Sequence, residues 1–265
     1  MMQQSFANQA VDILKADESV IGLAVGGSWL TNELDEFSDL DLILVTKSKI
    51  AGNKNKMLDY ANKLGNLLTG FTGEHVGEPR LLICLYDKPL LHVDIKFLTL
   101  DEFKQRIETP VILLDTSKQL QQALVASVPE FPYPDYQWME DRFWVWVHYA
   151  LLKVGRGELL EALDFLGFLR ITVLGPLLQI KNKELPRGTR KLETQLNATD
   201  FAAIQATIAN YNAVSILNSL DQAIQLYKNT RKLVFENEIR LQLETEKKVI
   251  SYFKEIQLKV NLVIS

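Results

Sequence analysis

The sequence predicts an α+β fold, in which a mixed β-sheet with flanking helices is followed by a helical bundle. In the first half, short β-rich runs alternate with helical patterns, whereas the second half consists of long stretches with helical periodicity. Between the halves, the stretch 129–135 holds three prolines, and each proline removes a backbone donor and disfavours a helix. We therefore expect two domains, residues 1–129 and 136–265, joined by this linker.

The elements of the first domain are predicted from runs of large apolar and β-branched residues and from apolar periodicity. The predicted strands are 21–25, 40–45, 80–86, 91–98 and 111–114, and the predicted helices are 58–68 and a short one from Asp101. The turn 87–89 contains a proline and predicts a hairpin between the third and fourth strands. Cys84 lies inside the third strand, where we expect a small buried side chain rather than a nucleophile.

The second domain is predicted as a bundle of long helices. Their expected bounds are 136–154, 158–179, 199–208, 213–234 and 238–260. The pair Gly175-Pro176 is expected to bend the second of these helices rather than end it.

The composition of the chain indicates its cellular compartment and the classes of partner that it is expected to bind. A net charge of −4 gives no electrostatic case for a nucleic-acid or anionic-membrane partner, because such partners usually select a basic face. The single cysteine excludes an intramolecular disulfide, and the N-terminus lacks the basic start and apolar run of a signal peptide. No apolar stretch approaches the roughly 20 residues that span a bilayer. We therefore expect a cytoplasmic protein without a membrane span.

An acidic pattern begins the second predicted strand. Asp39 and Asp41 are two residues apart, so that both side chains point to the same face of the strand. Leu40, Leu42 and Leu44 alternate with them and supply the buried face. Clustered carboxylates repel and raise one another's pKa, and a divalent cation removes this penalty. The pair therefore predicts a cation site where the strand enters the sheet.

A third carboxylate, Asp94, lies in the middle of the predicted strand 91–98. If that strand neighbours 40–45, the three aspartates meet at one edge. Oxygen ligands of this kind suit Mg²⁺, and two such ions can activate an acceptor oxygen and neutralise a transferring phosphoryl group. Gly26 and Gly27 permit a tight turn after the first strand, which places Ser28 at a helix N-terminus where its hydroxyl and backbone N–H groups can hold a phosphate.

This order of motifs resembles the nucleotidyltransferase superfamily, which includes DNA polymerase beta and the aminoglycoside nucleotidyltransferases. The resemblance covers about residues 20–98 and rests on Gly27-Ser28, on Asp39-Leu40-Asp41 and on Asp94. It implies that Asp39 and Asp41 bind both metal ions, that Asp94 completes one metal site and helps to deprotonate the acceptor, and that Gly27 and Ser28 hold the triphosphate. The implied cosubstrate is ATP or another NTP, and the implied cofactor is a pair of Mg²⁺ ions.

The first helix of the second domain carries an aromatic and basic stripe. Its members recur at helical spacing: Arg142, Trp146, Tyr149, Lys153 and Arg156. Such a stripe can stack a base and bind phosphate charge, or it can be the solvated side of an amphipathic helix. With Phe143-Trp144 and Glu158 it resembles the start of the helical domain in streptomycin-type aminoglycoside adenylyltransferases, whose lysine-bearing helix closes over the triphosphate. The resemblance implies Lys153 as a phosphate ligand, and the stripe itself makes Tyr149 and Arg156 candidates for the nucleotide site.

Three carboxylates near this helix bear on the acceptor. Glu140, Asp141 and Glu158 would attract a polycationic molecule and repel RNA phosphates, and Glu140 is a candidate to take the proton from the attacking hydroxyl. These acids could equally do no more than favour a helix N-terminus through its dipole. Arg142 stands where the resembled enzymes often carry an acid before Phe-Trp, which leaves the acceptor site open.

We therefore predict a metal-dependent enzyme that transfers a nucleoside monophosphate, with AMP favoured, from an NTP to a hydroxyl of a small polar molecule such as an aminoglycoside-like compound. Two alternatives stay open. The acceptor could be a protein or RNA, as in antitoxin-type nucleotidyltransferases, or the chain could be a nucleotide-binding module without turnover. The sequence also leaves open whether the chain forms a homodimer.

Overall fold

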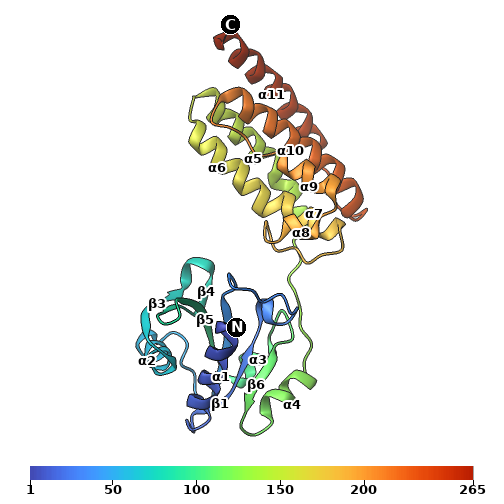
Figure 1. The fold of residues 1–265 in the computed structure, drawn as a ribbon. Coiled ribbons are helices and arrows are strands. Elements are labelled where there is room, and N and C mark those ends of the chain that lie inside the picture. The colour runs from blue at the N-terminus through green and yellow to red at the C-terminus, as the bar shows by residue number, and fades with distance from the viewer. Residues whose placement is uncertain (265) are drawn as a thin grey trace. The chain divides into compact units, whose positions relative to one another are not determined.

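The computed structural model describes residues 1–264, and the side chains of residues 1–260. The chain divides into two compact units, Met1–Pro132 and Tyr133–Ser265. This division falls inside the proline-rich segment 129–135. The first unit contains the β-sheet and the second is helical (Figure 1), so the predicted α+β fold class is confirmed.

A six-stranded mixed sheet in the order β3-β4-β5-β2-β1-β6 forms the centre of the first unit. Its strands are β1 (Val20–Val25), β2 (Leu40–Thr46), β3 (Leu67–Gly73), β4 (Glu78–Tyr86), β5 (Leu91–Leu98) and β6 (Val111–Asp115). The central neighbours β2 and β5 run parallel, and the other neighbouring pairs run antiparallel. Alternate residues of β2 and β5 therefore face opposite sides of the sheet in step with each other.

Helices cover the two faces of the sheet unequally. On one face, α1 (Met2–Leu14) and α2 (Lys54–Leu64) bury the leucines of β2 in the main apolar core. On the other face, α3 (Leu100–Lys104) and α4 (Gln119–Val125) cover Val45 and Leu98, which lie at the C-terminal ends of β2 and β5. Asp41 and Asp94 lie on this second face, near the opposite ends of the same strands, and are part of neither apolar core.

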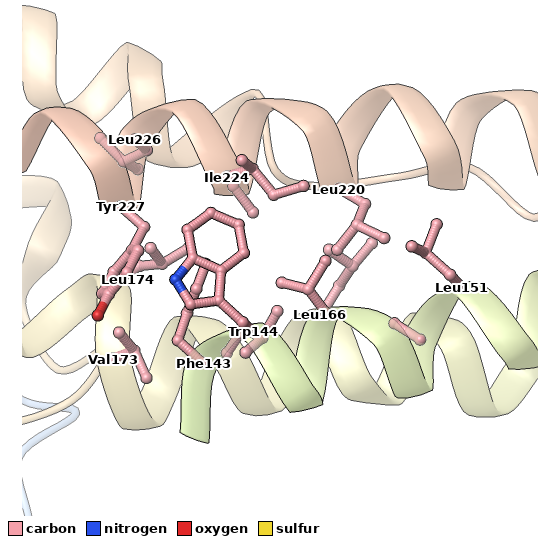
Figure 2. Close-up of a cluster of buried hydrophobic side chains, with 14 of the residues drawn as sticks. Phe143, Trp144, Leu151, Leu166, Val173, Leu174, Leu220, Ile224, Leu226 and Tyr227 are labelled. Carbon is pink, nitrogen blue, oxygen red and sulfur yellow. The ribbon is translucent and has the colours of Figure 1, made fainter. Parts of the chain in front are cut away.

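The second unit packs its helices around α5 (Tyr136–Gly155). The other elements are α6 (Leu159–Leu169), the π-helical turn η3 (Arg170–Leu174), α7 (Gly175–Lys181), α8 (Leu192–Gln195), α9 (Ala198–Gln205), α10 (Ala213–Val234) and α11 (Leu243–Ile264). Figure 2 shows the aromatic centre of this core, where the Phe143 and Tyr227 rings stack with centroids 3.6 Å apart and Trp144 lies beside them. Each such fully buried side chain contributes about 1.5–3 kcal/mol to the free energy of unfolding.

The elements α6, η3 and α7 follow one another as a single helical run, Leu159–Lys181. The run therefore continues past Gly175-Pro176, which confirms that this pair does not end the helix. At 23 residues and a mean hydropathy of 1.5, the run is long and apolar enough to cross a membrane, by length and composition only. This corrects the expectation that no stretch of the chain approaches that length. Half of its most apolar window is buried within the protein, as is usual for the core helix of a bundle.

Candidate functional site

The two strands that carry the predicted carboxylates are neighbours. The parallel register of β2 and β5 places Asp41 directly beside Asp94, on strands that lie about 4.8 Å apart in an ordinary sheet. Leu40 and Leu42, on either side of Asp41, are almost completely buried on the opposite face. The alternation predicted for this strand is thus confirmed, and it presents both carboxylates on the face that the helices leave partly uncovered.

The Gly-Gly-Ser turn lies against the same carboxylates. The Gly26 N–H donates a hydrogen bond to the Asp41 carbonyl, 3.0 Å, which ties the turn to the start of β2. Gly27 has a φ of 62°, and a Cβ built at this position would lie 1.9 Å from the Asp41 Oδ2. Only glycine allows both this backbone conformation and this approach. Ser28 lies within a single 3-10 turn, Gly27–Trp29, and its hydroxyl has no hydrogen-bond partner among the residues that the structure describes.

Asp39 precedes β2 and is held near the other two acids by the loop before it. The fully buried Gln3 of α1 donates from Nε2 to the carbonyl groups of Asp35, 2.9 Å, and Ser38, 2.7 Å. This anchor fixes the backbone immediately before Asp39. No feature of the sequence pointed to Gln3, because a glutamine near the N-terminus has no recognisable pattern.

The electrostatics of Asp94 reflect its neighbours. Burial raises the pKa of the Asp94 carboxyl above its ordinary value, His92 partly offsets this rise, and the negative charge of Asp39 adds to it. A divalent cation beside these acids would favour the charged form of Asp94 and so reverse the shift. Within residues 1–260, no three Asp, Glu, His or Cys side chains already stand in a metal-binding arrangement. Asp39, Asp41 and Asp94 offer the oxygen donors that Mg²⁺ prefers, and their predicted role as its ligands stays a prediction.

His92 shares the face of Asp94, as its spacing predicts, and its Nε2 lies 3.0 Å from the Asp94 Oδ1. A cavity of about 290 Å³ opens next to this pair. Its walls include Glu36, Phe37, Asp39 and His92, and Phe37 is 86% exposed. The cavity therefore combines acidic groups with an exposed aromatic ring, at the edge of the aspartate cluster.

Glu108 is a site residue that the sequence did not reveal. It precedes β6 in sequence, yet its Oε1 accepts a hydrogen bond of 2.9 Å from the Gly27 N–H, and a Cβ at Gly26 would lie 2.7 Å from the same oxygen. The Gly27 N–H is one of the groups predicted to hold phosphate. A carboxylate oxygen thus occupies a position of the turn that is predicted to bind a phosphate. Because the two residues are 81 positions apart, no local pattern could have linked them.

The predicted nucleotide ligands of the second unit, Lys153, Tyr149 and Arg156, are bound by two nearby carboxylates. The Lys153 ammonium lies 2.8 Å from Glu158 and 3.0 Å from Glu161, and 4.9 Å from the centroid of the Tyr149 ring. Hydrogen bonds to Glu158 and Glu161 raise the Lys153 pKa above its ordinary value. The Tyr149 hydroxyl donates to Glu161, and Arg156 pairs with Glu158 at 2.8 Å. To bind a phosphate, the Lys153 ammonium would have to break its ion pairs with Glu158 and Glu161, or contact the phosphate while it keeps them.

Glu140 does not have the exposure that its predicted role needs. It is fully buried in the helical unit, where it accepts hydrogen bonds from the Tyr227 hydroxyl at 2.5 Å, Arg231 at 3.0 Å and the Gln242 N–H at 2.9 Å. Arg231 in turn binds Glu246 at 2.5 Å. This burial speaks against Glu140 as the base that receives a proton from the acceptor, and indicates a structural role in joining α5, α10 and the start of α11.

Comparison with known proteins gives similarity at the level of the fold. No family model and no curated protein sequence matches this chain. Among solved structures, it is similar to an aminoglycoside 6-adenyltransferase from Bacillus subtilis, with 16% identity, a TM-score of 0.42, and coverage of 96% of this chain and 98% of the other. It is also similar to a nucleotidyltransferase-like protein from Exiguobacterium sibiricum 255-15, with 11% identity, a TM-score of 0.33, and coverage of 89% and 79%. These values are too low to assign an activity or a substrate.

Proposed function

We propose that this chain transfers a nucleotidyl group from an NTP to a small polar acceptor, using Mg²⁺ held by Asp39, Asp41 and Asp94. The observation that supports this most directly is the placement of Asp41. Its strand register sets it beside Asp94, and its carboxylate lies over Gly27 of the glycine turn. Carboxylates for a metal ion and backbone N–H groups for a phosphate thus meet within one unit of the protein, which is the combination that phosphoryl-group chemistry needs.

Each group has a distinct task in this proposal. The three carboxylates would hold Mg²⁺, whose charge neutralises the triphosphate when it is bound. Gly27 and Ser28 would donate hydrogen bonds to phosphate oxygens from the turn before β2. ATP is the favoured donor in this proposal, and all four NTPs are tested because no residue of the first unit has been identified that would distinguish among the bases.

The cavity beside Asp39 supports a small, positively charged acceptor. Glu36 and Asp39 contribute carboxylates to its walls, and Phe37 offers an apolar ring face. Such walls suit a hydroxyl-bearing amine of the aminoglycoside kind, and they would repel the phosphates of RNA. The whole chain carries a net charge of −4, which also favours a cationic acceptor over a nucleic acid.

The decisive experiment is a pyrophosphate-release screen with the full chain. Each of the four NTPs is combined with Mg²⁺ and with aminoglycosides, lincosamides, free nucleotides or tRNA. We expect release with a small cationic acceptor that disappears on addition of a chelator. Asp41→Asn and Asp94→Asn should each lower the rate by several orders of magnitude, whereas Asp12→Asn, which changes an exposed acid paired with Lys15, should leave it unchanged.

Other outcomes of the screen would replace the proposal. Release that requires tRNA or a protein would make the acceptor a macromolecule. Magnesium-dependent NTP binding without release for any acceptor would favour a nucleotide-binding module. If neither binding nor release depends on Asp41 and Asp94, the assignment of the site is wrong.

A further inference from the structure

The helical unit contains a second cavity, which the proposed reaction does not use. It has a volume of about 380 Å³ and lies between the C-terminal end of α6, the start of α8, and α9. Most of its wall is apolar, with Ile171, Phe201 and Ile204 among the lining residues. A volume of this size is at the lower end of the range for small-molecule sites in proteins.

One guanidinium group enters this apolar wall. Arg170 lines the cavity and donates from one terminal nitrogen to the Thr207 carbonyl at 2.7 Å. Burial lowers the Arg170 pKa, and in the part of the chain that the structure describes no carboxylate offsets this effect or forms an ion pair with Arg170. Arg231 of the same unit shows the usual arrangement, because its buried guanidinium is bound by Glu140 and Glu246. A partly buried charge without an anion costs free energy, and a bound anion would reduce this cost. The remaining N–H groups of the Arg170 guanidinium are the donors that such a ligand would accept from.

The local backbone explains how Arg170 comes to this position. Arg170 is the first residue of the π-helical turn Arg170–Leu174, and Ile171, the next residue, also lines the cavity. Pro176 follows this turn, and a proline removes a helical hydrogen bond and presses on the carbonyl four residues before it, here that of Thr172. A wider turn relieves this crowding. Such turns are rare in proteins and occur frequently at functional sites.

We infer that this cavity is a binding site for a small monocarboxylate with an aromatic or branched apolar body. The guanidinium of Arg170 matches one carboxylate, whose two oxygens can accept from its free donors. Phe201 and Ile204 provide the surface for the apolar part. Glu193 also lines the cavity, and its negative charge disfavours ligands with two charges, such as phosphate monoesters and dicarboxylates.

A matched pair of probes tests this inference on the full chain. We would titrate 1-naphthoate and 1-naphthamide, which share the ring system and differ in charge, and follow binding by calorimetry and by ligand-observed NMR. The acid should bind about tenfold more tightly than the amide, as expected for a charge-assisted hydrogen bond in a partly buried site. Arg170→Gln should remove this preference, and Glu193→Lys should strengthen the binding of the acid.

Control variants separate a specific site from general attraction. Arg142→Gln removes the same charge from another helix, where Arg142 covers the Trp138 ring, and it should leave naphthoate binding unchanged. Asp41→Asn should also leave it unchanged, which keeps this inference independent of the proposed transferase activity. Equal affinity for acid and amide would overturn the inference, as would an acid preference that survives Arg170→Gln. If Arg170→Gln fails to fold, the naphthoate affinity of Glu193→Lys is the test. An affinity equal to that of the wild type overturns the inference.

Discussion

Replacement of Gly27 by alanine tests the geometry of the candidate active site in one step. The φ of 62° costs an alanine about 1–2 kcal/mol, and the new Cβ would lie 1.9 Å from the Asp41 Oδ2. An ordinary contact needs about 3.5 Å, so the carboxylate must move by roughly 1.5 Å. Because Asp41 is a short side chain on a rigid strand, its carboxylate can rotate away at small cost to the fold. A displacement of this size at a catalytic group lowers a rate by about 100-fold or more.

A second glycine provides the matched control. Gly52 also has a positive φ, 89°, but a Cβ there meets no atom within 4 Å. Gly27→Ala and Gly52→Ala should therefore lose similar amounts of unfolding free energy in urea, about 1–2 kcal/mol each. Only Gly27→Ala should lose magnesium-dependent nucleotidyl transfer. If the two variants keep or lose activity together, Asp41 and the turn do not cooperate in the way that we propose.

Three further predictions follow from buried or partnered carboxylates. Glu140→Ala leaves the buried Arg231 with a weakened network, and we expect a loss of about 3–5 kcal/mol in a urea titration. Hydrogen bonds from Arg80, and to a smaller extent from Lys96, lower the pKa of Glu78 from an ordinary 4.5 to about 2. The charged carboxylate therefore stabilises the fold above about pH 4.5, and this contribution is lost as the pH falls towards 2. Glu78→Gln should remove that part of the acid sensitivity in thermal melts. Glu108→Gln removes the carboxylate that binds the Gly27 N–H and should tighten NTP binding in a fluorescence titration.

Each of these predictions has a result that would contradict it. Glu244 is an exposed acid on α11, so Glu244→Ala is the control for Glu140→Ala, and equal losses would show that the buried network adds nothing. If the melting temperature falls with pH in the same way in Glu78→Gln and in the wild type, Glu78 does not contribute to the acid sensitivity. Weaker NTP binding in Glu108→Gln would mean that Glu108 supports the nucleotide site rather than competing for the turn.

The structure also shows where local patterns failed. The edge strand β3 (Leu67–Gly73) escaped detection because most of its residues are not buried, and its mixture of leucine, phenylalanine, threonine and glycine shows no clear alternation. The helix expected at 58–68 instead spans Lys54–Leu64, because the Asn53 side chain caps its start by accepting from the Lys56 N–H, and because 67–68 belong to β3. The N-terminal helix α1 was not predicted at all. For β3 an edge position, and for α2 a cap, rather than apolar periodicity, sets the bounds of the element, whereas α1 does bury an apolar face that includes Phe6, Ala10 and Leu14.

The amino-acid sequence alone predicts the α+β class, most of the buried strands, and the two strands that carry Asp41 and Asp94, because apolar alternation and helical periodicity are local properties. It could not show that these strands are parallel neighbours in register, since two other strands separate them along the chain. Pairing over such distances depends on which faces the whole sheet buries. For the same reason, local patterns could not predict that Glu108 contacts the glycine turn, or that Glu140 is buried among partners more than 80 residues away in sequence, because both contacts form only when distant segments pack together.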